Sequence, residues 1–251
     1  MQCTPVTASD QEQARCCSRF LIVSAAWANP PGQDQAQAVS NLRWEEGRPD
    51  CTFSRDDDGK YRYGLWSGDF GVVLAVDSQE LEKVRRRAQP IFALLLTVHY
   101  RGKDSLDVAP DKIALEFVKH YHDVQSTLDP NILVIQQQKD ADALAEVTER
   151  EIRRHPEKKE EKDATLAGRQ KDFAEMIEFL KTRSLRATTL DSRHPEASGW
   201  VLFSTKSKWI DGLRKQEQFV LRVPVGERMV EFPFSLPPSE GDLILRTRPE
   251  N

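Results

Sequence analysis

Three histidines have the spacing of candidate metal ligands. His120 and His122 are two residues apart, and alternate residues of a strand point to the same side. His99 ends an apolar run that a neighbouring strand could carry, and Glu116 has the same parity as the pair. One hypothesis is therefore a zinc site of three histidines, or of two histidines and a glutamate. The other hypothesis places His120 and His122 on the solvent side, beyond the end of a strand.

Other candidate chemistry is sparse in this sequence. The acidic run at residues 56–59 has oxygen ligands suited to calcium, but no glutamate follows at EF-hand spacing, and its Asp-Gly step fits a hairpin turn. The sequence has no Gly-x-Ser-x-Gly elbow, no His-Glu-x-x-His pair, no phosphate-binding glycine loop and no dinucleotide fingerprint. We therefore expect a protein without enzymatic activity and without a cofactor.

Tryptophans offer a candidate contact surface for another protein. Trp209 lies in a charged segment beside Lys206 and Lys208, and an exposed tryptophan among lysines is a plausible partner contact. Trp66 and Trp200 could join it in an aromatic ligand platform. Trp200, however, lies in a strongly apolar run, which favours packing in the core.

The charge pattern argues against nucleic-acid binding, and the hydropathy pattern argues against a transmembrane segment. The chain has 251 residues and a net charge of −4, and its basic run at residues 85–87 has acidic neighbours rather than forming a stripe. This pattern argues against nucleic-acid binding. No apolar run approaches the roughly 20 residues that a membrane-spanning helix needs, so no transmembrane segment is expected.

The N-terminus has the order of a secretory signal peptide. Arg15 and Arg19 precede a short apolar run at residues 20–27, and Ala26 and Ala28 give a small-x-small cleavage site. We predict a leader at residues 1–28, a flexible mature N-terminus at 29–40, and an exported protein that is periplasmic or extracellular. The alternative is that this segment is a helix or strand of the fold.

Two-residue alternation dominates the rest of the chain. Segments near residues 51–53, 61–65, 71–76, 91–100, 113–117, 186–190, 199–204, 219–223 and 230–234 are expected to be strands. Turn residues separate them, including an expected hairpin turn near Gly226. This count of short strands predicts a mainly β fold, with a two-sheet sandwich over residues 41–130 and 184–238.

The periodicity changes between the two halves of this predicted sandwich. Apolar residues at 144, 145, 148 and 152, and again at 166, 173, 177 and 180, recur every three or four positions. Pro156 separates the two runs. We therefore predict an inserted antiparallel αα-hairpin at residues 131–183, and a polar tail at 239–251 with one possible short strand.

The last strands carry a resemblance to a known group. The segments 199–203 (Gly-Trp-Val-Leu-Phe), 219–224 (Phe-Val-Leu-Arg-Val-Pro) and 231–236 (Glu-Phe-Pro-Phe-Ser-Leu) resemble the closing strands of telokin-like, immunoglobulin-type domains of bacterial exported proteins. The resemblance covers about the last quarter of the chain. It implies an immunoglobulin-like β-sandwich and export, but no particular reaction. The helical insertion departs from the pattern of that group.

Three functions remain open at this stage. The first is an interaction or scaffold protein, with the helical hairpin as a contact arm for an unknown protein partner or for a second copy. The alternative is a metal-binding or metal-dependent module that uses His99, His120 and His122. The third is a sensor that binds a small apolar molecule between hairpin and sandwich.

The predicted leader can be tested by mass spectrometry of the mature protein. Cleavage after Ala28 gives a chain of residues 29–251 in which Cys51 is the single cysteine, so no internal disulfide can form. An intact N-terminus in protein isolated from its source would contradict the predicted export.

Overall fold

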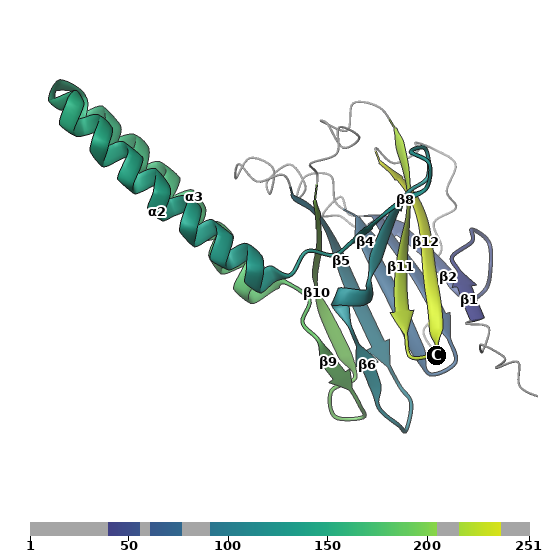
Figure 1. Cartoon of the computed structure of the whole chain (residues 1–251). Helices are drawn as coiled ribbons and strands as arrows, with labels where there is room; N and C mark the ends of the chain where they lie inside the picture. Colours follow the sequence, from purple (N-terminus) through teal and green to yellow (C-terminus); the bar gives the residue numbers. More distant parts are fainter. Residues whose placement is uncertain (1–39, 56–60, 77–90, 205–215, 237–251) are drawn as a thin grey trace, which may run out of the picture. The chain divides into compact units, whose positions relative to one another are not determined.

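The computed structural model describes residues 40–55, 61–76, 91–204 and 216–236. These residues form a mainly β fold with two α-helices (Figure 1). The predicted leader, the acidic turn at 56–59, the basic run at 85–87, the Trp209 segment and the C-terminal tail lie outside the described residues.

One five-stranded sheet is antiparallel throughout. Its spatial order is β10-β5-β4-β3-β2. The strands are β2 (Cys51–Arg55), β3 (Tyr61–Ser67), β4 (Phe70–Val76), β5 (Ile91–Tyr100) and β10 (Glu196–Ser204). Strand β5 lies between β4 and β10 and is buried over most of its length, in keeping with its nearly continuous apolar sequence.

The second five-stranded sheet has the order β1-β12-β11-β7-β8. Its strands are β1 (Ser40–Arg43), β7 (Ala114–Phe117), β8 (Asp123–Ser126), β11 (Glu217–Val225) and β12 (Arg228–Leu236). Only β1 pairs in parallel with its neighbour in this sheet. Strands β11 and β12 form a two-residue hairpin in which Gly226 has φ 59°, as a tight turn of this kind requires.

Aromatic rings connect the two sheets. Phe92 of β5 stacks on Phe219 of β11 with ring centroids 5.7 Å apart, and Tyr63 of β3 lies 6.5 Å from Phe234 of β12. These residues are at most 5% exposed. The inward face of each sheet is therefore covered by the other, and outward residues such as Arg222 and Glu231 alternate with the buried ones.

The predicted strands are confirmed as elements, with three additions. Strand β1, strand β8 and strand β6 (Leu106–Val108) were not predicted, whereas the strand expected at 186–190 is β9 (Thr188–Leu190), which pairs with β6. The three additions are three or four residues long, too short to show a clear alternation. A short 3-10 helix, η1 (Pro110–Lys112), precedes β7.

Two helices of 25 residues each interrupt the strands. They are α2 (Pro130–Arg154) and α3 (Lys159–Arg183), joined by a single 3-10 turn, η2 (Pro156–Lys158). Asp129 caps α2 by accepting a hydrogen bond from the Asn131 N–H at 2.7 Å, and Pro130 takes the first helical position. We call α2, η2 and α3 the helix pair; Figure 1 shows the two helices side by side.

Both linkers to the helix pair are bonded to strand β10. The Leu128 N–H donates to the Leu202 carbonyl at 2.7 Å, before α2, and the Leu185 N–H donates to the Trp200 carbonyl at 2.9 Å, after α3. Residues Ser184 and Trp200 also form an isolated parallel bridge. The linkers thus pair with the edge of the sheet that β10 would otherwise leave open.

Gly199 makes this backbone contact possible. A Cβ atom at Gly199 would lie 2.5 Å from both the N and the Cα atom of Leu185. We expect Gly199→Ala to lower the free energy of unfolding by about 1–3 kcal/mol, because a main-chain segment must move to admit the methyl group. Urea denaturation measures this change.

Gly168 provides the matched control. A Cβ atom at this exposed position in α3 would meet no atom within 4 Å. Gly168→Ala should therefore raise the free energy of unfolding by up to about 1 kcal/mol through helix propensity. Equal effects of the two substitutions would show that the close approach at Gly199 does not contribute to stability.

Candidate interaction surface

The two helices contact each other along a heptad seam. The buried or half-buried positions of α2 at residues 134, 137, 141, 144 and 148 alternate in steps of three and four, and α3 contributes residues 166, 173, 176 and 180. This spacing is the one that keeps two long helices in contact over their length. The apolar periodicity in the sequence therefore indicated the side of each helix that contacts the other.

The seam is polar at two of its buried positions. Gln137 is fully buried, and both polar atoms of its side-chain amide lack a hydrogen-bond partner in the described structure. Thr148 is 8% exposed and donates to the Leu144 carbonyl at 2.8 Å. A buried unpaired amide costs about 1–3 kcal/mol. The contact between the two helices is therefore less stabilising than an apolar seam of the same length would be.

Three large apolar side chains of α2 face solvent instead of the seam. Ile132 is 65% exposed, Ile135 is 55% exposed and Val147 is 43% exposed. At about 100° per residue, Ile132 and Ile135 lie on the side of α2 opposite Gln137 and residue 141. We call Ile132 and Ile135 the outer stripe of α2; Val147, twelve residues after Ile135, is turned about 120° from Ile135 around the helix axis.

Charged residues cover the rest of the helix pair. Arg153 and Glu149 form an ion pair at 2.6 Å within α2, and Lys162 of α3 bonds Glu151 of α2 at 2.6 Å. The hydrogen bond from Lys162 lowers the pKa of Glu151, and the bond to Glu151 raises the pKa of Lys162. These pairs are exposed, so they contribute to solubility more than to stability. Within the described residues, neither helix has a stretch long and apolar enough to cross a membrane.

Arg186 connects the two ends of the helix pair. One guanidinium nitrogen donates to the Asn131 side-chain oxygen at 2.8 Å, and another donates to the carbonyls of Leu180 and Lys181 at 3.1 and 3.3 Å. The first bond joins the start of α2 to the linker after α3. The others satisfy carbonyls at the C-terminal end of α3 that have no helical partner.

The structure separates the three histidines of the predicted metal site. His99 belongs to β5, where its ring stacks on Trp66 with centroids 5.4 Å apart and its Nδ1 lies 3.4 Å from Glu196. His120 and His122 belong to the connection between β7 and β8, in the other sheet. No group of three or more His, Cys, Asp or Glu side chains in the described part of the chain is placed to hold a metal ion.

The His-x-His spacing lies in a turn, not on a strand. Strand β7 ends at Phe117, and Tyr121 and His122 both have φ 57°, so alternation does not apply to them. His120 Nε2 lies 3.1 Å from a Glu217 carboxylate oxygen, while His122 contacts Glu116. Each imidazole thus has its own carboxylate partner.

Of the predicted tryptophan contacts, the structure describes Trp200 but not Trp209. Trp209, Lys206 and Lys208 lie outside the described residues. Trp200 is 9% exposed and lies 6.0 Å from Phe179 of α3, ring centroid to ring centroid, so it packs where the helix pair meets β10.

A row of charged side chains on the outer face of the second sheet was not predicted from the sequence. Arg43 bonds Glu231 at 2.9 Å, Glu231 lies 3.4 Å from Arg222, and Arg222 contacts the buried carboxylate of Glu116, which also meets His122. Because these residues belong to neighbouring strands, the row connects β1, β12, β11 and β7. The alternation of charged with apolar residues in β11 and β12 indicates which charged side chains face outward. The order of the strands, which the sequence does not give, is needed to know which of these side chains are neighbours.

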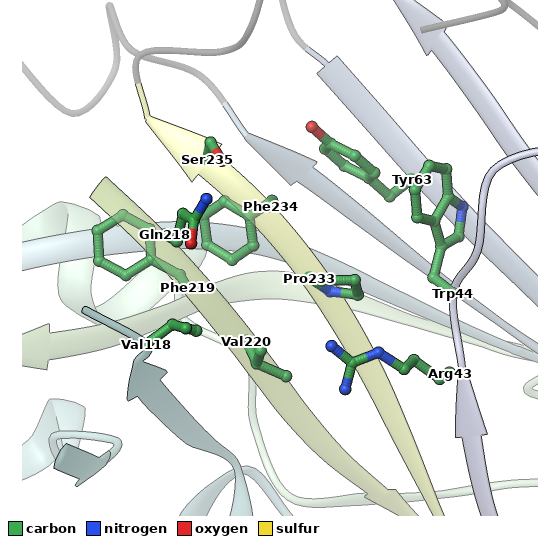
Figure 2. Close-up of a pocket in the computed structure, with 10 residues that line it drawn as sticks. All are labelled: Arg43, Trp44, Tyr63, Val118, Gln218, Phe219, Val220, Pro233, Phe234 and Ser235. Atoms are coloured by element: carbon green, nitrogen blue, oxygen red, sulfur yellow. The ribbon is translucent and has the colours of Figure 1, made fainter. Parts of the chain in front are cut away.

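A cavity of about 420 Å³ lies beside strands β11 and β12. Figure 2 shows ten residues that line it: Arg43, Trp44, Tyr63, Val118, Gln218, Phe219, Val220, Pro233, Phe234 and Ser235. Its walls are mostly apolar, and the charged residue among these ten is already paired with Glu231. Trp44 donates its indole N–H to the Thr52 carbonyl at 3.0 Å and meets the Tyr63 ring edge-on. The cavity therefore offers packing surface but few free polar groups.

Tyr63 makes stability sensitive to alkaline pH. Burial raises the pKa of its hydroxyl from 10.0 to about 12. The unfolded chain therefore ionises first, so this contribution to stability is complete below pH 10 and is lost as the pH rises through 12. We expect the wild-type protein to lose about 1.4 kcal/mol more than Tyr63→Phe between about pH 9 and 11. Urea denaturation at both pH values tests this, and equal losses in the two proteins would contradict it.

Comparison with known proteins leaves the chain without an assigned family. No protein-family model, curated protein or solved structure matches it. Its function is therefore inferred from the geometry of its own side chains.

Proposed function

We propose that this protein is a non-enzymatic interaction protein in which an immunoglobulin-like β-sandwich carries an antiparallel αα-hairpin as its contact arm. The two sheets joined by aromatic rings support the sandwich assignment. The ion pair between Glu151, near the end of α2, and Lys162, near the start of α3, supports an antiparallel hairpin. The partner is another protein.

The outer stripe of α2 is the observation that carries this proposal. Single exposed apolar residues are common on protein surfaces. Here Ile132 and Ile135 are each more than half exposed and occupy one side of the same helix, facing away from the seam. Neither residue contributes to the contact between α2 and α3. An apolar helix stripe with this spacing is the form in which helices bind a groove or another helix.

The attachment of the helix pair supports a role as a contact arm. Its ends are held by main-chain hydrogen bonds to β10 and by Arg186, while its seam contains a buried unpaired amide. A helix pair needed mainly to complete the protein core would be expected to bury Ile132 and Ile135, which lie at its attached end. Here both face solvent, where a partner can bury them.

We predict that Ile132→Glu with Ile135→Glu abolishes partner binding without unfolding the protein. Both side chains are exposed and glutamate is a good helix former, so the helix should persist. A partner that buries both isoleucines should be bound more than about a hundredfold more weakly, because two buried aliphatic side chains together contribute about 3–6 kcal/mol. Cross-linking of the tagged full chain in its source cells, followed by mass spectrometry, measures the yield of each cross-linked protein.

The matched control adds the same charge to the other helix. Ala164 and Ala167 are exposed in α3, so Ala164→Glu with Ala167→Glu should leave the cross-linked yield unchanged. Sedimentation velocity separates binding to a second copy from binding to a different protein. If the two double variants lose the same partners, or if neither loses any, the outer stripe is not the contact surface. Unfolding of the sheets on deletion of residues 131–183 would show instead that the helix pair is a structural part of the fold.

A further inference from the structure

A second cavity lies where the helix pair joins strand β10. Its volume is about 300 Å³, at the lower end of the range for small-molecule sites. It is lined by Pro110, Asp111, Thr127, Leu128, Asp129, Pro130, Asn131, Leu185, Arg186, Ala187, Trp200, Val201 and Leu202. The lining therefore includes both linkers of the helix pair, the first turn of α2 and the middle of β10. We call it the root cavity.

Most of the wall of the root cavity is apolar. Leu185, Trp200 and Leu202 are at most 9% exposed and pack into the core, so they form a fixed wall. The linker residue Leu128 is held to Leu202 by the main-chain hydrogen bond that joins the linker to β10. The backbone around the cavity is therefore fixed by bonds that do not depend on a ligand.

Three charged side chains are among the described residues that line the root cavity, and two of them hydrogen-bond to neutral groups of the helix pair. The Arg186 guanidinium donates to Asn131 and to the last carbonyls of α3. Asp129 accepts from the Asn131 N–H as the cap of α2, so its charge is directed to the helix N-terminus. Asp111, at the start of η1, is exposed and has no ion-pair partner within the described residues.

We propose that the root cavity binds a small organic cation, a primary ammonium group on a short aromatic or branched alkyl chain. The apolar part of such a ligand fits against Leu185, Trp200 and Leu202. Its ammonium group forms an ion pair with the Asp111 carboxylate, and the free carboxylate oxygen of Asp129 offers a second hydrogen-bond acceptor. An anion of the same shape would meet two carboxylates and one guanidinium, so the charged groups of the lining favour a cation.

This site is distinct from the outer stripe, so the two proposals can fail separately. The test uses the full chain and three probes that share a phenyl ring and a short chain: phenethylammonium, 2-phenylethanol and 3-phenylpropanoate. Isothermal titration calorimetry measures the affinity of each. We expect phenethylammonium to bind about fivefold more tightly than the neutral alcohol, the ratio that one exposed ion pair supplies. The carboxylate should bind most weakly.

Two variants locate the site. Asp111→Asn should reduce the affinity for phenethylammonium most of the way toward that for the alcohol, whereas Glu160→Gln, an exposed carboxylate in α3 outside the cavity lining, should leave it unchanged. Ala187 is an exposed lining residue, so Ala187→Phe should fill the cavity and abolish binding of the ammonium and the alcohol while leaving the unfolding midpoint within a few degrees of wild type.

Three results would overturn this inference. Absence of measurable binding by all three probes would exclude the site. Equal affinity for the ammonium and the alcohol would exclude recognition of a cation. Binding that survives both Asp111→Asn and Ala187→Phe would place the ligand elsewhere on the protein.

Discussion

Strand β10 lies at the edge of its sheet, and the carbonyl groups on its open side need hydrogen-bond donors. The N–H groups of Leu185 and Leu128 supply them, at Trp200 and at Leu202. Because these donors belong to the linkers on either side of the helix pair, the sheet edge determines where the helices attach. The bond from Leu185 also requires glycine at position 199, because a side chain there would occupy the position of the Leu185 backbone. The helix pair and the root cavity both depend on this main-chain contact.

Stability and the proposed contact surface are divided between the two parts of the fold. The sheets enclose fully buried aromatic residues such as Phe92 and Phe232. The helix pair instead buries Gln137 without a hydrogen-bond partner and leaves Ile132 and Ile135 in solvent. A polar residue in such a seam costs stability, but it can select one register of the two helices. This division suits a contact surface carried on helices whose position is set by the sheets.

The sequence was most informative where one periodicity extends over many residues. Strand β12 and both helices could be predicted for this reason, because burial repeats every two residues in the strand and every three to four in the helices. It was misleading at His120 and His122, where spacing alone implied a strand but the backbone turns at Tyr121 and His122 with positive φ. The contact at Gly199 and the charges around Asp111 depend on segments far apart in the sequence, so no local pattern could reveal them. Gly199, before Trp200, entered the sequence analysis only through the resemblance to other domains. In the structure it allows the Leu185 backbone to approach β10 closely.

The first turn of α2 belongs to both proposed sites. Asp129, Pro130 and Asn131 line the root cavity, and Ile132, the next residue, begins the outer stripe. The Asp129 cap and the hydrogen bond from Leu128 to Leu202 already fix this turn without a ligand. The positions of Ile132 and Ile135 therefore do not depend on occupancy of the root cavity, and the two neighbouring sites can be filled independently.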